Sequence, residues 1–212
     1  MTIAIAGILA VLIAPTVGKM RSSARSAKCM SNLRQMAPAF QSYVADHDGR
    51  YPLSHNLTTN FDNNWWYALA PYISEIVISD WTDVRRICAP NSPLGCPETD
   101  VKDKSYPEPW ISYEMTRAHR AWMDANGGWN SSEPGLLAVR ITNPARSLLV
   151  AEGHGNPDFN TWSDDKAKAR SGLVYPHNGR TNVLLADGHV TSYSLEELKE
   201  EWKQLYTPAI DK

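Results

Sequence analysis

Acidic residues are missing from the first 45 positions of this 212-residue chain. Over Met1–Val17 basic residues are missing too, and only Thr2 and Thr16 interrupt an apolar run. Residues 27–44 instead repeat their apolar positions every three or four residues, which predicts an amphipathic helix lying on a folded domain. We therefore expect one long helix whose first part packs in lipid or against other helices and whose second part packs on a globular domain.

The net charge is also small, cysteines are few, and no pair of a nucleophile and a general base stands out. The formal net charge is −2, so the chain has no overall attraction to nucleic acid. No nucleophile stands at catalytic spacing from a general base, and we therefore do not expect an enzyme. Three cysteines are too few for a zinc site made of two cysteine pairs.

The cysteine spacing predicts a disulfide between Cys88 and Cys96, which flank the loop APNSPLG, in an oxidising compartment. We expect Cys29, on the helix seam, to be buried as an apolar side chain.

The apolar run is slightly shorter than the roughly 20 residues that a membrane-spanning helix needs. A secretory signal peptide would carry a basic stretch before the run and a small-residue cleavage site after it, and neither is clear here. We interpret the run as a spanning helix whose beginning is missing, with Pro15 tolerated where neighbouring helices pack around it.

Beyond the long helix, breakers divide the chain into short elements. Asp48-Gly49 should end the helix, because glycine supplies a left-handed cap. The segment WWYALAPYISEIVISDW predicts a short helix with these inward residues: Trp66, Leu69, Ala70, Ile73 and Val77. LLAVRI and SLLVAE predict two strands around Asn143-Pro144, and Ser194 with Glu197 forms a capping box for a final helix.

A β-hairpin is predicted over residues 177–193. Asp187-Gly188 stands between NVLLA and HVTSY, where a two-residue turn with positive φ at both positions would join two strands. Val183 and Leu185 would share one face, and His177 would hydrogen-bond across the hairpin and fix its register.

Two matches place the chain beside a known family. The stretch from Ile3 to Pro52 resembles the N-terminal helix of type IV pilin-like proteins, in particular the DUF1559-like pseudopilins of planctomycetes and verrucomicrobia. His177, nine intervening residues and Asp187-Gly188 match that family's H-X9-DG motif, and Cys96-Pro97 matches its Cys-Pro. In the family, a methylated Phe and a Glu precede the residue equivalent to Met1, and the Glu pairs with a neighbouring subunit's amine. This sequence lacks both.

The resemblance implies an α+β, pilin-like fold, with an N-terminal helix over residues 1–48 (its membrane or filament-core part at 1–17) on a small antiparallel sheet domain over residues 49–212. It implies a structural subunit of a secretion-system pseudopilus or an extracellular filament, processed by a prepilin peptidase and assembled on a pilus platform with copies of itself or other pilin-like subunits. The assembly helix would use these residues: Ile3, Ile5, Gly7, Ile8, Leu9, Leu12, Ile13 and Pro15.

The resemblance further implies a single-pass inner-membrane protein with an extracytoplasmic globular domain. By the positive-inside rule, however, the basic residues that follow the apolar run would hold the C-terminal side in the cytoplasm, so the residues alone leave the orientation open.

No cofactor is required, but two metal sites are open alternatives. Imidazoles and carboxylates suit a transition metal, and Asp187 and His189 could share a strand face. The candidate ligands are Glu152, His154, His177, Asp187 and His189. A calcium site would instead use oxygen atoms, with Asp187 and Glu152 as ligands.

Two other functions stay open. Eight tryptophans could give a membrane-anchored module a glycan- or protein-binding surface, although their irregular spacing favours core packing. A metal-dependent hydrolase is the third alternative.

Overall fold

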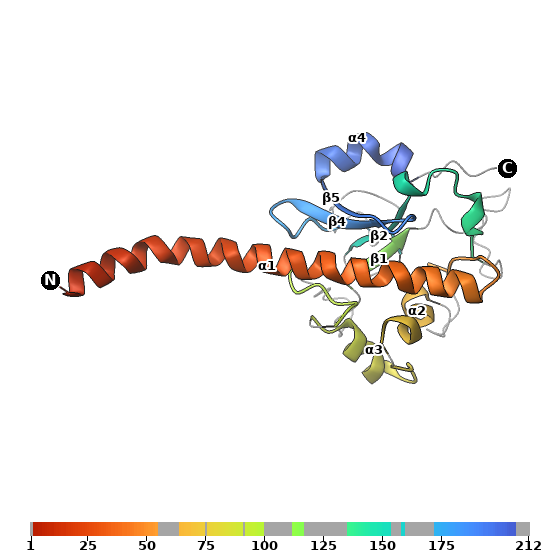
Figure 1. Ribbon diagram of the computed structural model, residues 1–212, viewed down its shortest axis with the longest axis horizontal. Coiled ribbons are helices and arrows are strands. Elements are labelled where there is room, and N and C mark those ends of the chain that lie inside the picture. Colours follow the sequence, from red (N-terminus) through yellow and green to blue (C-terminus); the bar gives the residue numbers. More distant parts are fainter. Residues whose placement is uncertain are drawn as a thin grey trace.

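The chain folds into a long helix, a small sheet and three shorter helices, as the computed structural model shows (Figure 1). The structure describes residues 2–54, 64–74, 76–90, 92–99, 112–116, 135–153, 158–159 and 172–206. The elements are α1 (Thr2–Asp46), α2 (Trp65–Ile73), α3 (Trp81–Cys88), β1 (Tyr113–Thr116), η3 (Ala138–Arg140), η4 (Pro144–Arg146), β2 (Leu148–Glu152), β3 (Asp158–Phe159), β4 (Arg180–Leu185), β5 (Val190–Ser194) and α4 (Leu195–Tyr206). The predicted α+β, pilin-like fold class is confirmed.

Helix α1 ends close to where the sequence predicts. Asp48 and Gly49 both have positive φ, 51° and 75°, and the Gly49 amide donates to the Val44 carbonyl oxygen at 2.9 Å. This is the left-handed cap that glycine favours after a helix. The division into domains 1–48 and 49–212 stays a prediction. Among the described residues, no helix combines the length and the apolar character needed to cross a membrane.

The sheet has the strand order β3-β1-β2-β4-β5. Strands β1, β2, β4 and β5 pair antiparallel, and the two-residue β3 pairs parallel with β1 at the edge. Successive side chains of β4 point to opposite faces. Val183 and Leu185 accordingly lie together in one apolar cluster, as predicted, while Leu184 lies in the other.

The two faces of the sheet carry different helices. The larger core lies on the α1 face and includes Leu33 and Phe40 of α1 with Trp65 and Trp66 of α2. Helix α4 covers the opposite face (Figure 1), and its Leu198 packs in the smaller cluster. The part of α1 that contributes to this core is therefore enclosed between the sheet and α2.

Helix α4 begins at the predicted capping box. The Glu197 amide donates to Ser194 Oγ at 3.2 Å, and the Ser194 amide donates to Glu197 Oε2 at 2.8 Å. The two reciprocal bonds satisfy backbone donors that the first helical turn leaves free.

Two turns differ from the prediction. Asn178 and Gly179 both have positive φ, 53° and 76°, between His177 and Arg180, whose backbones exchange two hydrogen bonds of 3.1 Å. The kind of two-residue turn that the sequence predicts at Asp187-Gly188 therefore occurs at Asn178-Gly179 instead. At the predicted site only Gly188 has positive φ, 91°, and its amide bonds back to Leu185, so β4 and β5 are joined by a longer loop.

Two further local predictions are wrong. Val77 is 75% exposed, because α2 ends at Ile73 and the residue lies beyond it. LLAVRI does not form a regular strand: Leu137 makes an isolated bridge to Arg50, and residues 138–140 form the turn η3. The predicted strand that ends at Glu152 is confirmed as β2.

We predict that Leu33→Ala lowers the free energy of unfolding by about 2–5 kcal/mol, because Leu33 is fully buried in the α1 core. The neighbouring Arg34 is exposed, and Arg34→Ala should change stability by about 0.5 kcal/mol or less. Urea unfolding of the two variants measures the difference. Equal effects would show that this part of α1 does not pack as the structure has it.

Candidate functional site

A disulfide joins α1 to the loop after α3. Cys29 and Cys96 are bonded, with their Cα atoms 5.2 Å apart and 67 positions apart in sequence. The predicted Cys88–Cys96 disulfide is therefore wrong. Cys88 is a free, buried cysteine at the end of α3, and burial raises the pKa of its thiol to about 12.

The loop before Cys96 folds back on the end of α3. The Ser92 amide donates to Ala89 and the Gly95 amide donates to Ser92, so the chain folds back in two successive turns. A side chain at Gly95 would clash with the Ala89 carbonyl. The end of this loop therefore lies against the backbone of residues 88–89, while the Cys96 sulfur bonds Cys29 of α1.

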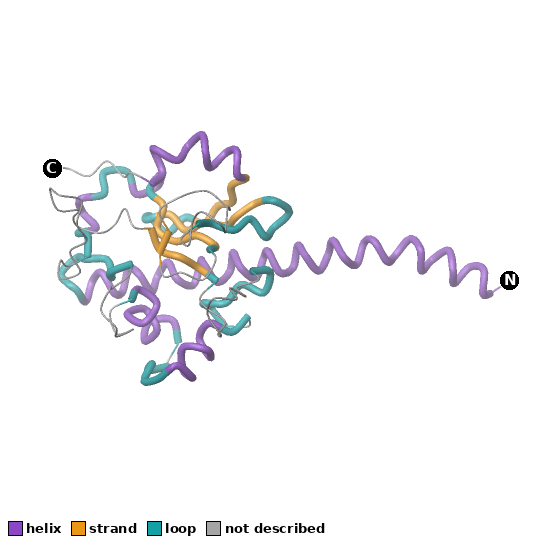
Figure 2. Tube along the Cα trace, turned by 180° about the vertical axis from the view of Figure 1, so that it is seen from behind, coloured by secondary structure: helices purple, strands orange, loops and turns teal. Residues whose placement is uncertain are grey.

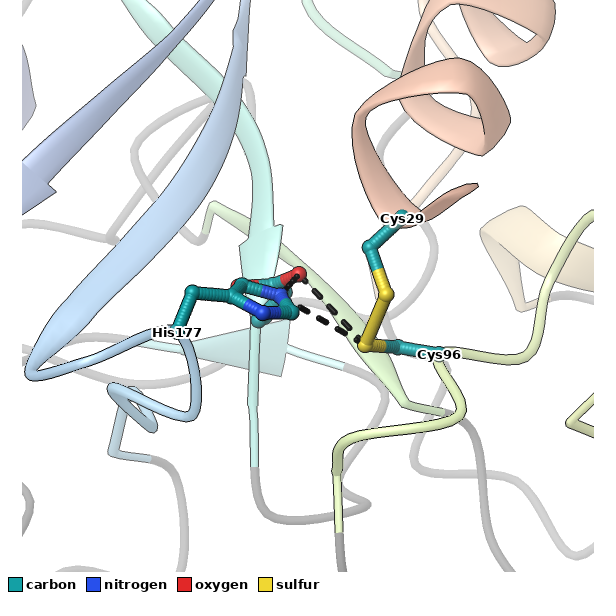
Figure 3. Close-up of side chains that lie close together, drawn as sticks. Cys29, Cys96 and His177 are labelled. Atoms are coloured by element: carbon teal, nitrogen blue, oxygen red, sulfur yellow. Dashed lines mark hydrogen bonds and ion pairs between the residues drawn. A yellow bond between two sulfur atoms is a disulfide. The ribbon is translucent and has the colours of Figure 1, made fainter. Parts of the chain in front are cut away.

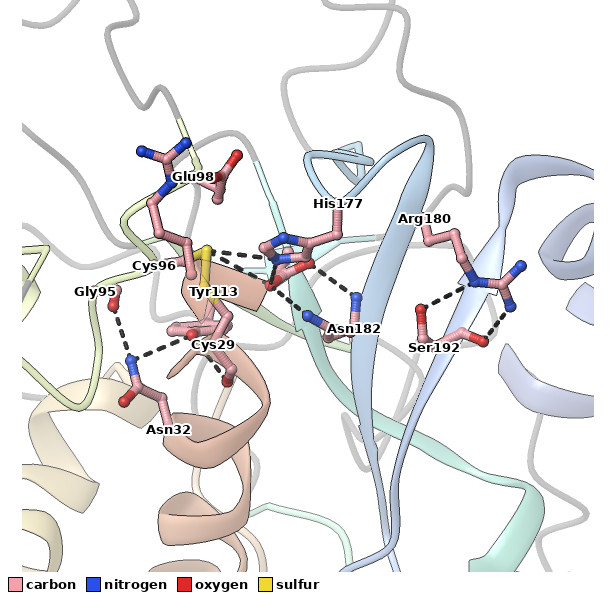
Figure 4. A network of polar contacts seen from close by, with 12 residues as sticks. Cys29, Asn32, Gly95, Cys96, Glu98, Tyr113, His177, Arg180, Asn182 and Ser192 are labelled. Atoms are coloured by element: carbon pink, nitrogen blue, oxygen red, sulfur yellow. Dashed lines mark hydrogen bonds and ion pairs between the residues drawn. A yellow bond between two sulfur atoms is a disulfide. The ribbon is translucent and has the colours of Figure 1, made fainter. Parts of the chain in front are cut away.

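Polar side chains hold this loop against α1 (Figure 4). Asn32 is fully buried, and its Nδ2 donates to the carbonyl oxygens of Gly95 at 2.8 Å and Ser92 at 3.2 Å. The Tyr113 hydroxyl donates to the Cys29 carbonyl oxygen at 3.3 Å. One turn of α1 is thus bonded to the cysteine loop and to β1.

A buried, hydrogen-bonded pair, Glu152 and His177, lies beside the disulfide. Glu152, fully buried at the end of β2, accepts a 2.7 Å hydrogen bond from His177 Nε2. Its carboxylate also accepts bonds from the Asn182 amide at 2.8 Å and from Asn182 Nδ2 at 3.2 Å. Burial raises the pKa of Glu152, while the bonds from His177 and Asn182 oppose that rise.

The disulfide and the Glu152–His177 pair form one cluster, which we call the C2EH cluster: Cys29, Cys96, Glu152 and His177 (Figure 3). Cys96 Sγ lies 3.6 Å from Glu152 Oε1 and 3.7 Å from His177 Nε2. The four potential ligand atoms all lie within 4.8 Å of one another, and all four residues are buried. The cluster is a candidate metal centre built from α1, the loop after α3, β2 and the turn before β4.

The structure brings together only part of the metal set expected from the sequence. Glu152 and His177 are in contact, but Asp187 and His189 are exposed in the loop between β4 and β5, where Asp187 Oδ1 accepts a bond from the His189 amide at 2.9 Å. His154 lies outside the described residues. The two cysteines of the cluster were missed because their sequence separation gives no sign of contact.

The two ends of the H-X9-DG motif lie in different parts of the structure. His177 is hydrogen-bonded to Glu152 and does not bridge the β4–β5 hairpin. Gly188 lies against α1, because a side chain there would meet Ala37 Cβ at 3.5 Å and Gln41 Nε2 at 3.6 Å. Close by, the Tyr51 hydroxyl donates to the Ala186 carbonyl oxygen at 3.2 Å. Gly188 therefore marks a close contact of the sheet with α1.

Tryptophan is mainly a core residue where the structure describes its surroundings. Trp65 and Trp66 are buried, and the Trp65 ring stacks on Phe40 with 6.0 Å between centroids. Trp202 is partly buried and stacks on Tyr206 at 4.6 Å. The remaining tryptophans lie outside the described residues or have side chains that the structure does not describe, so the alternative of a glycan-binding surface stays untested for them: Trp81, Trp110, Trp122, Trp129 and Trp162.

The disulfide predicts a specific pattern of sensitivity to reduction. Closing a loop across 67 positions should stabilise the protein by about 4 kcal/mol in the chain-entropy model. In metal-free buffer, reduction should lower the stability of wild type and of Cys88→Ala by this amount and leave Cys29→Ala unchanged. Denaturant unfolding with and without reductant measures it. Sensitivity that is lost in Cys88→Ala and kept in Cys29→Ala would contradict the Cys29–Cys96 pairing.

The buried carboxyl predicts a pH dependence. Because the pKa of Glu152 is raised above 4.5, the folded state binds more protons than the unfolded state at pH values between the two, and stability falls as pH rises through that window. Glu152→Gln cannot ionise, so its stability relative to wild type should rise with pH above about 4.5. Urea unfolding across that range gives the two curves.

Glu197→Gln is the control of opposite sign. Hydrogen bonds from the Ser194 amide and Arg180 lower the pKa of the exposed Glu197, so this carboxylate stabilises the fold above its unfolded pKa. The stability of Glu197→Gln relative to wild type should therefore fall as pH rises toward about 4.5, below the window of Glu152, and the unfolding curves are extended to cover that range. Parallel curves for Glu152→Gln and wild type would show that Glu152 does not titrate as a buried acid.

Comparison with known families finds a match over part of the chain. Residues 18–87 match the model of a family described as "Protein of unknown function (DUF1559)". No curated protein and no solved structure matches the chain. The family match begins after the apolar run and ends before the H-X9-DG motif, so it bears on neither. Over the segment from the middle of α1 to the end of α3, it supports the resemblance to the DUF1559-like family.

Proposed function

We propose that the chain is a pilin-like structural subunit that assembles through the N-terminal part of α1. The observation that carries the proposal is the division of this 45-residue helix. Its C-terminal half supplies buried residues, from Cys29 to Phe40, to the core. Its N-terminal part extends away from the sheet and the other helices in both views (Figures 1 and 2).

The sequence of the extended part favours association with apolar surroundings. Met1–Val17 carries no charged side chain, and a helix of this composition is stabilised by packing against other apolar helices or lipid. Copies of the chain could bury these segments together as the centre of a filament, with the sheet domains outside. The role is structural, and the proposal assigns no catalytic residue.

The proposed location is an inner membrane, with the sheet domain on its extracytoplasmic side. The Cys29–Cys96 disulfide supports that side, because disulfides persist in oxidising compartments and are rare in the cytosol. Proposed partners are further copies or other pilin-like subunits, a prepilin peptidase and an assembly platform.

We predict that protein purified from its native membrane in detergent forms filaments or large oligomers when the detergent is removed. Leu12→Glu should abolish this assembly, because it places a charge in the apolar part of α1. Analytical ultracentrifugation and negative-stain microscopy measure the assembly, and circular dichroism checks the fold.

Gln35→Glu is the matched control, since it adds the same charge to α1 at an exposed position beside the sheet domain. It should assemble like wild type. Wild-type protein that stays monomeric without detergent, or Leu12→Glu protein that assembles equally well, would refute the proposal.

A further inference from the structure

We infer that the C2EH cluster binds one zinc ion when its two cysteines are reduced. The cluster offers two sulfur atoms, one imidazole and one carboxylate, all buried and drawn from four separate parts of the chain. Four ligands of these types match a closed, tetrahedral structural zinc site. The inference concerns the folded domain alone and does not depend on filament assembly.

Two distances within the cluster agree with this geometry, and a third would have to lengthen. With Zn–S about 2.3 Å and Zn–N or Zn–O about 2.1 Å, a tetrahedron has sulfur-to-nitrogen and sulfur-to-oxygen edges of about 3.6 Å. Cys96 Sγ lies 3.7 Å from His177 Nε2 and 3.6 Å from Glu152 Oε1. The 2.7 Å hydrogen bond between Glu152 and His177 would open to an edge of about 3.4 Å.

The charge of the site is also reasonable. Two thiolates, one carboxylate and a neutral imidazole around Zn²⁺ give a net charge of −1, the same as a site of three cysteines and one histidine. Asn182 holds the carboxylate through two hydrogen bonds and orients it, as outer partners of metal ligands do. Calcium, which takes six to eight oxygen ligands, does not suit this set.

The two states of the cluster are connected by a balanced exchange. A dithiol reductant transfers two electrons and two protons to the Cys29–Cys96 disulfide, which becomes two thiols while the reductant becomes a disulfide. Zinc binding then releases the two thiol protons. The proton that His177 Nε2 now donates to Glu152 passes to Nδ1, so the imidazole stays neutral and the Nε2 lone pair binds the metal. The disulfide form of the reductant takes back the two electrons and two protons, which restores the Cys29–Cys96 bond and expels the ion.

The metal would replace the lost covalent bond in stabilising the fold. All four ligands are at most 5% exposed, so the ion has to enter during folding or local opening. Zinc bound in the reduced state would join α1, the cysteine loop, β2 and the turn before β4. In the oxidised protein the disulfide and the Glu152–His177 pair hold the same segments.

The test is to refold the full chain with a phosphine reductant, with and without one equivalent of Zn²⁺, and to compare it with the oxidised protein. Native mass spectrometry should find one zinc per reduced chain and none per oxidised chain, and zinc should raise the melting temperature of the reduced chain alone. Cobalt should give the visible absorption of tetrahedral thiolate coordination. Reduced wild type that binds no zinc, or that binds cobalt without the thiolate bands, overturns the inference.

Variants separate this site from other thiols. Reduced Cys88→Ala should still bind one zinc, because the free Cys88 is outside the cluster. Cys96→Ser and His177→Ala should lose stoichiometric binding. Stoichiometric zinc in both variants also overturns the inference, and the cobalt spectrum of the wild type decides the matter if they do not fold.

Discussion

The covalent bond between Cys29 and Cys96 is the constraint on which the arrangement of this protein depends. It fixes one turn of α1 to a loop more than 60 residues further along the chain. The Glu152–His177 pair packs on the same bond and brings in the end of β2 and the turn before β4. Sheet, loop and helix therefore meet at one buried polar centre (Figure 4).

The two ends of the H-X9-DG motif act at different points of the same interface. His177 contributes to the buried centre near Cys29, and Gly188, whose positive φ favours glycine, lies where the β4–β5 loop contacts α1 near Ala37 and Gln41. The nine residues between His177 and Asp187 include β4. They separate the contact near Cys29 from the contact near Ala37, both beside α1. Both ends of the motif thus take part in the packing of the sheet domain on the long helix.

Elements with a strong local signal could be predicted from the sequence. The helix end at Gly49, the strand ending at Glu152 and the cap of α4 depend on neighbouring residues and were found. Helix α3 has a good N-cap, Asp80, but it is only eight residues long and was missed. The turn His177-Asn178-Gly179-Arg180 had a usable signal, because Asn-Gly favours positive φ at both positions.

The site itself could not be predicted, because its contacts join residues that are far apart in sequence. Cys96 bonds Cys29, 67 positions away, and not Cys88, its neighbour in sequence. Glu152 and His177 were both candidates, but their partners were sought at Asp187 and His189. Periodicity and spacing report local geometry, whereas this cluster is set by how the sheet docks on α1.

The most direct measurement is peptide mapping of the non-reduced protein, digested at acidic pH to prevent thiol exchange and analysed by mass spectrometry. The account predicts a cross-linked pair of peptides containing Cys29 and Cys96, with Cys88 recovered as a free thiol. A cross-link between Cys88 and Cys96, with Cys29 free, would contradict it.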